Sequence, residues 1–264
     1  MRQKHPIWKK LLLALSSLVL TVVGFELGAY VWDYAQYGVR KVDGQPQGLY
    51  IRDGNPEPRL LPGAHLSGLF HSISVNAHAM RGPEITVPEP ANTTRVWCVG
   101  GSTTFDIFAS DNTHTWPAVA QRYLSEALQG RNIELLNGGV PGDILEGSAR
   151  KLATHGRSLG VDYVLIYHGP NDMRAASGGH FVIPDAVSIP LRSLALLQTW
   201  AQGRGLGSGE LPDRAPTSRD RQTLLNRLDF LERTIRSMGL RPIYATHALR
   251  IAPGARMDYG SMDG

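Results

Sequence analysis

The sequence has almost no cysteine, and it has no excess of charge beyond its first residues. Cys98 is the one cysteine among 264 residues. A disulfide framework needs paired cysteines and a Cys/His zinc site needs clustered ones, so both are excluded. The net charge of +4 comes from the first ten residues, and the rest of the chain carries 23 basic and 23 acidic residues. Because a nucleic-acid binder needs a basic surface, we expect no nucleic-acid partner.

A long apolar run follows the basic N-terminus. It extends from Leu11 to Trp32, with Glu26 near its far end. A helix of this length covers roughly 33 Å, which is enough to cross a bilayer. Aromatic residues flank the run on both sides, as they flank membrane spans, and positive charge before a span favours a cytoplasmic N-terminus. We therefore predict a cytoplasmic basic segment at 1–10 and a transmembrane signal anchor at 11–32.

Two other interpretations of the run remain open. A cleaved signal peptide would need a pair of small residues after the apolar core, where Phe25, Glu26 and Leu27 stand instead. A buried core helix fits poorly with four cations followed by a nearly unbroken apolar stretch. Either the anchor or the cleaved signal places the rest of the chain outside the cytoplasmic membrane. Residues 33–93 are rich in Pro, Gly and Asn and indicate a stalk and a loop-rich lead-in.

From residue 94 onward, short apolar strands alternate with amphipathic helices. The expected strands are Val96–Val99, Ile133–Leu136, Tyr163–Tyr167 and Pro242–Thr246, and the expected helices lie at Trp116–Leu128, Ile144–Ser158 and within Leu191–Gln202 and Arg219–Met238. This alternation predicts an α/β domain over 94–264, with a parallel sheet covered on both faces. The segment 175–218 interrupts the rhythm with glycines and prolines, and we interpret it as an insertion and a possible lid.

Three of the predicted strand ends carry residues that suit acyl transfer. Ser102 follows two glycines, Gly142 precedes a helix with its N–H available to an anion, and Asn171 follows the most apolar strand. Each feature alone is also explained by an ordinary turn or helix cap. In an open parallel sheet, however, strand ends meet at one edge, so the three would supply a nucleophile and oxyanion donors together.

These three blocks, in this order, resemble the SGNH/GDSL hydrolase family. Val99–Thr104 is similar to the family's first block in a GGST form, with Gly101 where many members have Asp. Asn137–Asp143 is similar to the second block, and Gly169–Asp172 matches the G-x-N-D third block. The lead-in stretch Asn76–Glu84 and the N-terminal anchor resemble the membrane-attached GGST members. The resemblance covers roughly residues 76–247.

The resemblance implies a flavodoxin-like three-layer α/β/α sandwich, hydrolysis of ester or thioester bonds, and no metal or organic cofactor. It also implies that Ser102 is the nucleophile and that Gly142 and Asn171 are oxyanion donors. The extracytoplasmic address favours an acyl ester of a small molecule, glycan or lipid as substrate. The acyl group, the alcohol and the oligomeric state are not predicted.

The family's final block, D-x-x-H with the catalytic base, is missing near the C-terminus. His114 has an aspartate three positions earlier, at Asp111, but comes far too early in the chain. His168 and His247 follow predicted strands; each is typical of a structural histidine that supports the site, and each is also a candidate base. A serine without a base is a weak nucleophile. The chain is therefore either a fragment of a longer hydrolase, with the fold incomplete at its C-terminus, or a domain that has lost catalysis and binds acylated glycans or lipids.

Overall fold

The computed structural model describes residues 6–39, 41–42, 45–51, 53, 55, 57–128, 131–178 and 217–245. Four parallel strands form its main sheet, in the order β6-β5-β7-β8. They are β5 (Thr93–Gly100), β6 (Asn132–Asn137), β7 (Tyr163–Tyr167) and β8 (Arg241–Tyr244). The predicted parallel α/β fold is confirmed, and each predicted strand lies within a few residues of its observed position.

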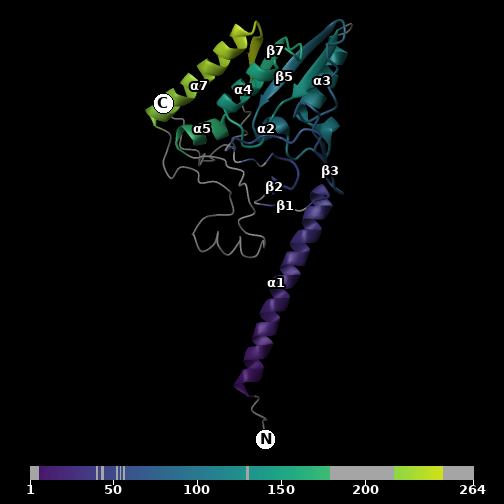
Figure 1. Ribbon diagram of the computed structural model, residues 1–264, viewed down its shortest axis with the longest axis vertical. Coiled ribbons are helices and arrows are strands. Elements are labelled where there is room, and N and C mark those ends of the chain that lie inside the picture. The colour runs from purple at the N-terminus through teal and green to yellow at the C-terminus, as the bar shows by residue number, and fades with distance from the viewer. Residues whose placement is uncertain are drawn as a thin grey trace, which may run out of the picture.

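Helices cover both faces of this sheet (Figure 1). Along β5, Trp97 and Val99 are buried in one core with residues of α4 (Leu145–His155) and α7 (Ser218–Ser237). Val96 and Cys98, which alternate with them, are buried on the other face, against Trp116 and Ala120 of α3 (Trp116–Ala127). Successive strand residues point to opposite faces, so the apolar run of β5 joins two cores. Burial also raises the pKa of the Cys98 thiol to about 12, which keeps it uncharged.

The N-terminal apolar run forms α1 (Ile7–Tyr37), one continuous helix. It is long and apolar enough to cross a membrane, and its apolar core is entirely exposed. It is longer than the predicted span, because its last turn continues to Tyr37, which packs into the domain. In Figure 1 α1 projects away from the sheet.

The lead-in packs against the domain rather than standing away from it. It contains two small antiparallel hairpins. These are β1 (Lys41–Val42) with β2 (Gln45–Pro46), and β3 (His65–Ser67) with β4 (Ser72–Ser74). Lead-in residues such as Leu60 and Ile73 share a buried cluster with Phe105 and Val140 of the sheet domain. The domain boundaries stay a prediction, but the lead-in forms part of the wall next to the strand ends.

Three short helical elements were not expected from the sequence. The short helix α2 (Ser102–Phe105), the 3-10 turn η1 (Asn112–His114) and α5 (Pro170–Ala176) occupy stretches interpreted as turns. The predicted insertion at 175–218 and the helix within Leu191–Gln202 lie, apart from the insertion's first and last few residues, outside the described residues.

Arg95 is a buried cation at the start of the sheet. Its side chain is fully buried, and it pairs with Glu134 at 2.7 Å on the neighbouring strand. It also donates to the carbonyl oxygens of Leu159 and Thr86, which belong to two separate loops. The buried guanidinium therefore has protein partners that offset its loss of contact with water.

Replacing this side chain tests its structural role. Arg95→Met should lower the free energy of unfolding by about 3 kcal/mol, because it removes the ion pair with Glu134 and the hydrogen bonds to two carbonyl groups, of which that of Leu159 is buried. Chemical denaturation of the chain in detergent measures the change. Arg233→Met is the control, since Arg233 pairs with Asp229 on the exposed face of α7, and it should cost about 0.5 kcal/mol or less. Equal effects of the two substitutions would contradict this role.

Candidate active site

Ser102 lies at the carboxyl end of the central strand, where β5 turns directly into α2. A Cβ added to Gly100 would lie 2.3 Å from the carbonyl oxygen of Tyr167, so only glycine fits this close approach of β5 and β7. Ser102 is partly exposed. It lines a pocket of about 30 Å³ together with His168 and Asn171. The structure thus brings two of the three predicted site residues to one hollow.

The loop that carries Gly142 lies beside Gly101 and Asn171. Asn171 donates through Nδ2 to the carbonyl oxygen of Asp143 at 3.0 Å. A Cβ built on Gly101 would lie 2.5 Å from Asn171 Nδ2 and 3.7 Å from that carbonyl oxygen. The ends of β5, β6 and β7 therefore converge within a few ångströms, as the sequence predicted. The same distances explain a glycine at position 101, because a side chain there would displace the Asn171 amide.

Two backbone donors near this point have no acceptor among the described residues. Within the part of the chain that the structure describes, the N–H groups of Ser102 and Gly142 form no hydrogen bond. Gly142 is buried and has φ +87°, a left-handed conformation that favours glycine. A buried N–H without a partner is uncommon, and a site that binds an oxyanion is one reason for it.

A buried polar network holds the two donor loops together. The carboxylate of Asp172 is fully buried; it accepts from the Leu145 N–H at 2.6 Å and contacts His168 Nδ1 at 3.0 Å. His168 Nε2 lies 2.9 Å from Ser148 Oγ, which donates to Asp143 at 2.9 Å. These contacts therefore connect the segment after β7, which carries Asn171, through α4 to the loop after β6, which carries Gly142.

The sequence indicated a structural role for His168, but not the network around it. The pair His168 and Asp172, four residues apart at a strand–helix junction, is the one local signal for it. Ser148 gave no local signal, because a serine within a helix is common.

The three histidines considered as base have different surroundings. Both ring nitrogens of His168 are engaged, by Asp172 and Ser148. His114 is largely exposed, and its Nδ1 lies 2.8 Å from Asp111. Hydrogen bonds from Thr113 and His114 hold the pKa of Asp111 well below its usual range. His247 lies outside the described residues. Within those residues, no histidine forms a hydrogen bond with Ser102 Oγ.

Arg81 stabilises the turn that carries Ser102. It is buried, and its guanidinium donates to the carbonyl oxygens of Phe105, Asp106 and Ala109 at 3.2, 2.7 and 3.3 Å. Its backbone N–H donates to the carbonyl oxygen of Asn137. Burial lowers the pKa of Arg81 to about 10, so the group stays charged at neutral pH. The lead-in stretch that supported the family resemblance therefore has a structural role here.

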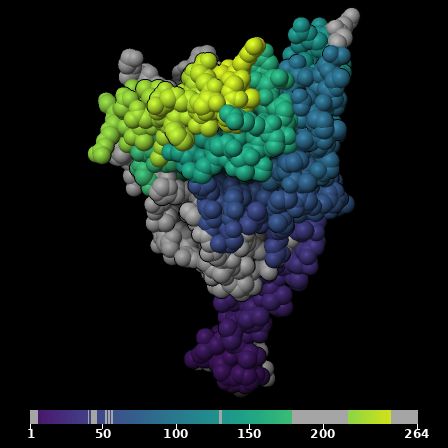
Figure 2. All heavy atoms as spheres, turned by 45° about the horizontal axis from the view of Figure 1, so that its top comes forward, coloured from purple at the N-terminus to yellow at the C-terminus, as the bar shows by residue number. Residues whose placement is uncertain are grey.

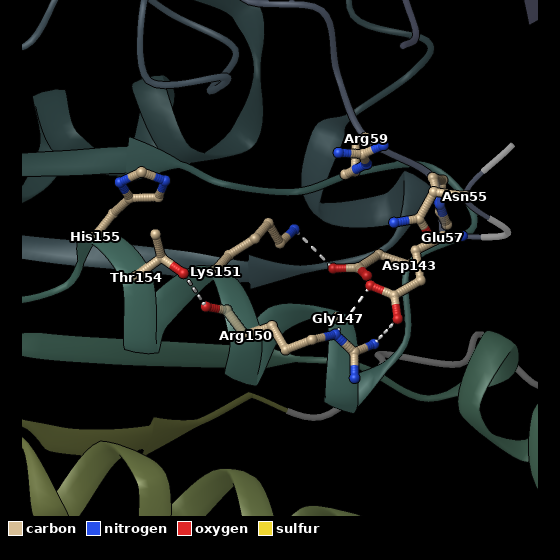
Figure 3. A pocket seen from close by; sticks show the side chains of 10 residues that line it. Asn55, Glu57, Arg59, Asp143, Gly147, Arg150, Lys151, Thr154 and His155 are labelled. Carbon is tan, nitrogen blue, oxygen red and sulfur yellow. Dashed lines mark hydrogen bonds and ion pairs between the residues drawn. The ribbon is translucent and has the colours of Figure 1, made fainter. Parts of the chain in front are cut away.

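A larger cavity of about 340 Å³ lies on the other side of Asp143, between the lead-in and α4 (Figure 3). Its cations face carboxylates: Lys151 contacts Asp143 at 2.7 Å, and Arg150 pairs with Glu57. Figure 3 shows both side chains reaching across to these partners. The cavity is thus lined by matched charges, and its polar contacts fix the Asp143 side chain behind the site.

No family model matches this chain, and no curated protein matches it. The solved structures that resemble it include esterases and lipolytic proteins of the SGNH and GDSL families. TesA matches at 16% identity and TM-score 0.36, over 57% of this chain and 59% of its own. AlinE4, an SGNH-hydrolase family esterase, matches at 14% identity and TM-score 0.33, over 59% and 77%.

The lipase/acylhydrolase from Enterococcus faecalis matches at 17% identity and TM-score 0.28, over 57% of this chain and 75% of its own. The chain thus spans about three fifths of the length of TesA. With identities this low, function is inferred from the residues of the site itself.

Removing the charge of Asp172 tests whether the network holds the site. Asp172→Asn keeps the shape of the side chain but loses the charge-assisted contact with His168, so the free energy of unfolding should fall by about 2 kcal/mol. Denaturation in detergent measures it. Asp229→Asn, an exposed carboxylate on α7, is the matched control and should change the value by less than about 0.5 kcal/mol. A fully stable Asp172→Asn protein would rule out this structural role.

Proposed function

We propose that the chain is a serine hydrolase of acyl esters, with Ser102 as nucleophile. The observation that carries the proposal is the convergence of Ser102, Asn171 and the loop that carries Gly142 at one edge of the sheet, with the N–H groups of Ser102 and Gly142 unpaired among the described residues. Membership of the SGNH/GDSL family is part of the same proposal. It is supported by the parallel sheet and by the order of the three sequence blocks.

In the proposed reaction, Ser102 Oγ attacks the ester carbonyl and its proton passes to a base. The oxyanion of the tetrahedral intermediate accepts hydrogen bonds from the N–H groups of Ser102 and Gly142 and from the Asn171 amide. That amide has two N–H bonds, so one donates to Asp143 while the other remains for the oxyanion. The intermediate expels the alcohol, which takes the proton from the base. Water then attacks the acyl-serine and releases the acid.

The second candidate is a binding domain without catalysis, which would hold an acylated glycan or lipid in the same crevice. It is favoured by one observation: no histidine of the described residues forms a hydrogen bond with Ser102 Oγ. The hydrolase proposal instead requires a histidine such as His247 to complete the site.

The proposed location follows from α1. We propose that α1 anchors the chain in a membrane and that the sheet domain lies on the extracytoplasmic side, because the basic residues precede the apolar run of the helix. An acyl ester of the envelope, on a glycan or a lipid, is then the substrate class within reach.

Hydrolysis of p-nitrophenyl esters and labelling by a fluorophosphonate test the function. The parent chain should hydrolyse the ester and take up one label, and Ser102→Ala should lose the label and at least about 100-fold of the rate. Ser158→Ala is the control, because Ser158 is an exposed serine three residues after the end of α4. It should leave both the rate of hydrolysis and the label unchanged.

The same experiment separates the two candidates. Absence of both hydrolysis and label in the parent chain would contradict the hydrolase proposal. Binding of an acylated ligand that survives Ser102→Ala, in a chain that never takes the label, would establish the binding domain.

A further inference from the structure

Three large apolar side chains are exposed on two neighbouring loops of the domain. Leu69 and Phe70 lie between β3 and β4 and are 84% and 54% exposed, and Phe108 follows α2 and is 88% exposed. We refer to these three residues as the apolar rim. Side chains of this size are rarely left in water as a group without a reason.

The first loop is fixed to the end of α1. The backbone N–H groups of Leu69 and Phe70 donate to the carbonyl oxygen of Ala35, at 2.7 and 3.3 Å. The rings of Phe70 and Trp32 lie 6.2 Å apart. Since the apolar run of α1 ends at Trp32, the loop lies beside the point where the predicted span ends.

The second loop is held against the first. The Ser72 N–H donates to the carbonyl oxygen of Ser110 at 2.7 Å, and His71 Nδ1 lies 3.3 Å from that of Ala109. Arg81 also donates to the Ala109 carbonyl oxygen. Phe108 therefore keeps its position relative to α1, and the exposed apolar surface of the helix continues onto the domain. Figure 2 shows α1, in purple, leaving the domain next to the blue lead-in.

We propose that the apolar rim lies in the headgroup region of the bilayer that α1 crosses. Continuity with the helix identifies lipid as the occupant, because the apolar core of α1 is entirely exposed and needs the same environment. Aromatic side chains such as Trp32 and Phe70 suit the membrane–water interface. The rim fixes how the domain is oriented on the membrane, which a single flexible anchor would not do.

This orientation bears on the substrate. The backbone N–H of Ile107 donates to the carbonyl oxygen of Ser102 at 3.3 Å, so Phe108 directly follows the turn that carries the serine. In Figure 1, α2 and α5 lie at the end of the sheet nearer to α1. The Ser102 crevice is thus near the lipid surface, and we infer that the ester it acts on belongs to a membrane lipid; this second step rests on the proposed function.

Quenching by lipid-borne nitroxides tests the contact. The full chain, with a fluorophore on Leu69→Cys or Phe108→Cys, is reconstituted in phosphatidylcholine vesicles containing nitroxide-labelled phosphatidylcholine. Cys98 is buried and stays unlabelled. Phe230→Cys, at an exposed phenylalanine of α7 away from α1, is the matched control, and Leu18→Cys in α1 reports the span. We expect quenching at 69 and 108 at least twofold stronger than at 230, and strong quenching at 18.

The outcomes distinguish the proposed lipid contact of the apolar rim from the proposed membrane anchor. Quenching at 18, with 69 and 108 no different from 230, overturns the contact and leaves the membrane anchor standing. No quenching at any position overturns both. A signal at 69 and 108 that follows the protein-to-lipid ratio instead of the nitroxide content assigns the rim to a second copy of the chain and overturns the lipid contact.

A second arm tests the substrate. The double variant Leu69→Asp, Phe108→Asp should lose at least tenfold of the rate on a lipid ester in vesicles and stay within twofold of the parent on a soluble p-nitrophenyl ester. Equal losses on both substrates overturn the inferred lipid substrate. A parent chain that hydrolyses neither ester contradicts the hydrolase proposal, while the quenching result still decides the lipid contact.

Discussion

The arrangement of the site depends on one buried carboxylate. Asp172 accepts from the first N–H of α4 and contacts His168, and through Ser148 the same network reaches Asp143. The loop before α4 carries Gly142, and the helix that contains Asp172 also carries Asn171. Charge-assisted hydrogen bonds in a water-free interior are strong and directional, so the two donors are held at a fixed separation before any ligand arrives. Preorganised donors of this kind are what an oxyanion requires.

The main sheet was predictable because its strands obey a simple physical rule. A strand covered on both faces is apolar throughout, as in Trp97–Val99 and Val164–Ile166, and its short length and the glycines that follow it distinguish it from a buried helix. The lead-in was less predictable. Its core residues, such as Leu60 and Ile73, are scattered among prolines and glycines, and they become buried only by contact with Phe105 and Val140, which lie far along the chain. Local pattern carries no information about such contacts. α5 was missed because Pro170 and Asn171 are turn formers that here begin a helix.

The site followed from the sequence to the extent that topology determines it. Residues at the ends of parallel strands must meet at one edge, so the convergence of Ser102 and Asn171 could be expected. The residues that support the site could not be predicted in this way. Arg81 and Ser148 reach the site from a loop and from a helix face, and their partners are mostly carbonyl oxygens and side chains that only the folded backbone brings near. The exposure of Leu69 and Phe108 beside α1 also depends on tertiary packing, since the two loops are far apart in sequence.

The central claim is that Ser102, Gly142 and Asn171 act on one atom. A crystal structure of the chain with a phosphonate bonded to Ser102 Oγ tests it most directly. The account predicts one phosphonyl oxygen within about 3 Å of the backbone nitrogens of Ser102 and Gly142 and of Asn171 Nδ2. A phosphonyl oxygen that points to solvent, with Gly142 and Asn171 in contact with other groups, would contradict the account.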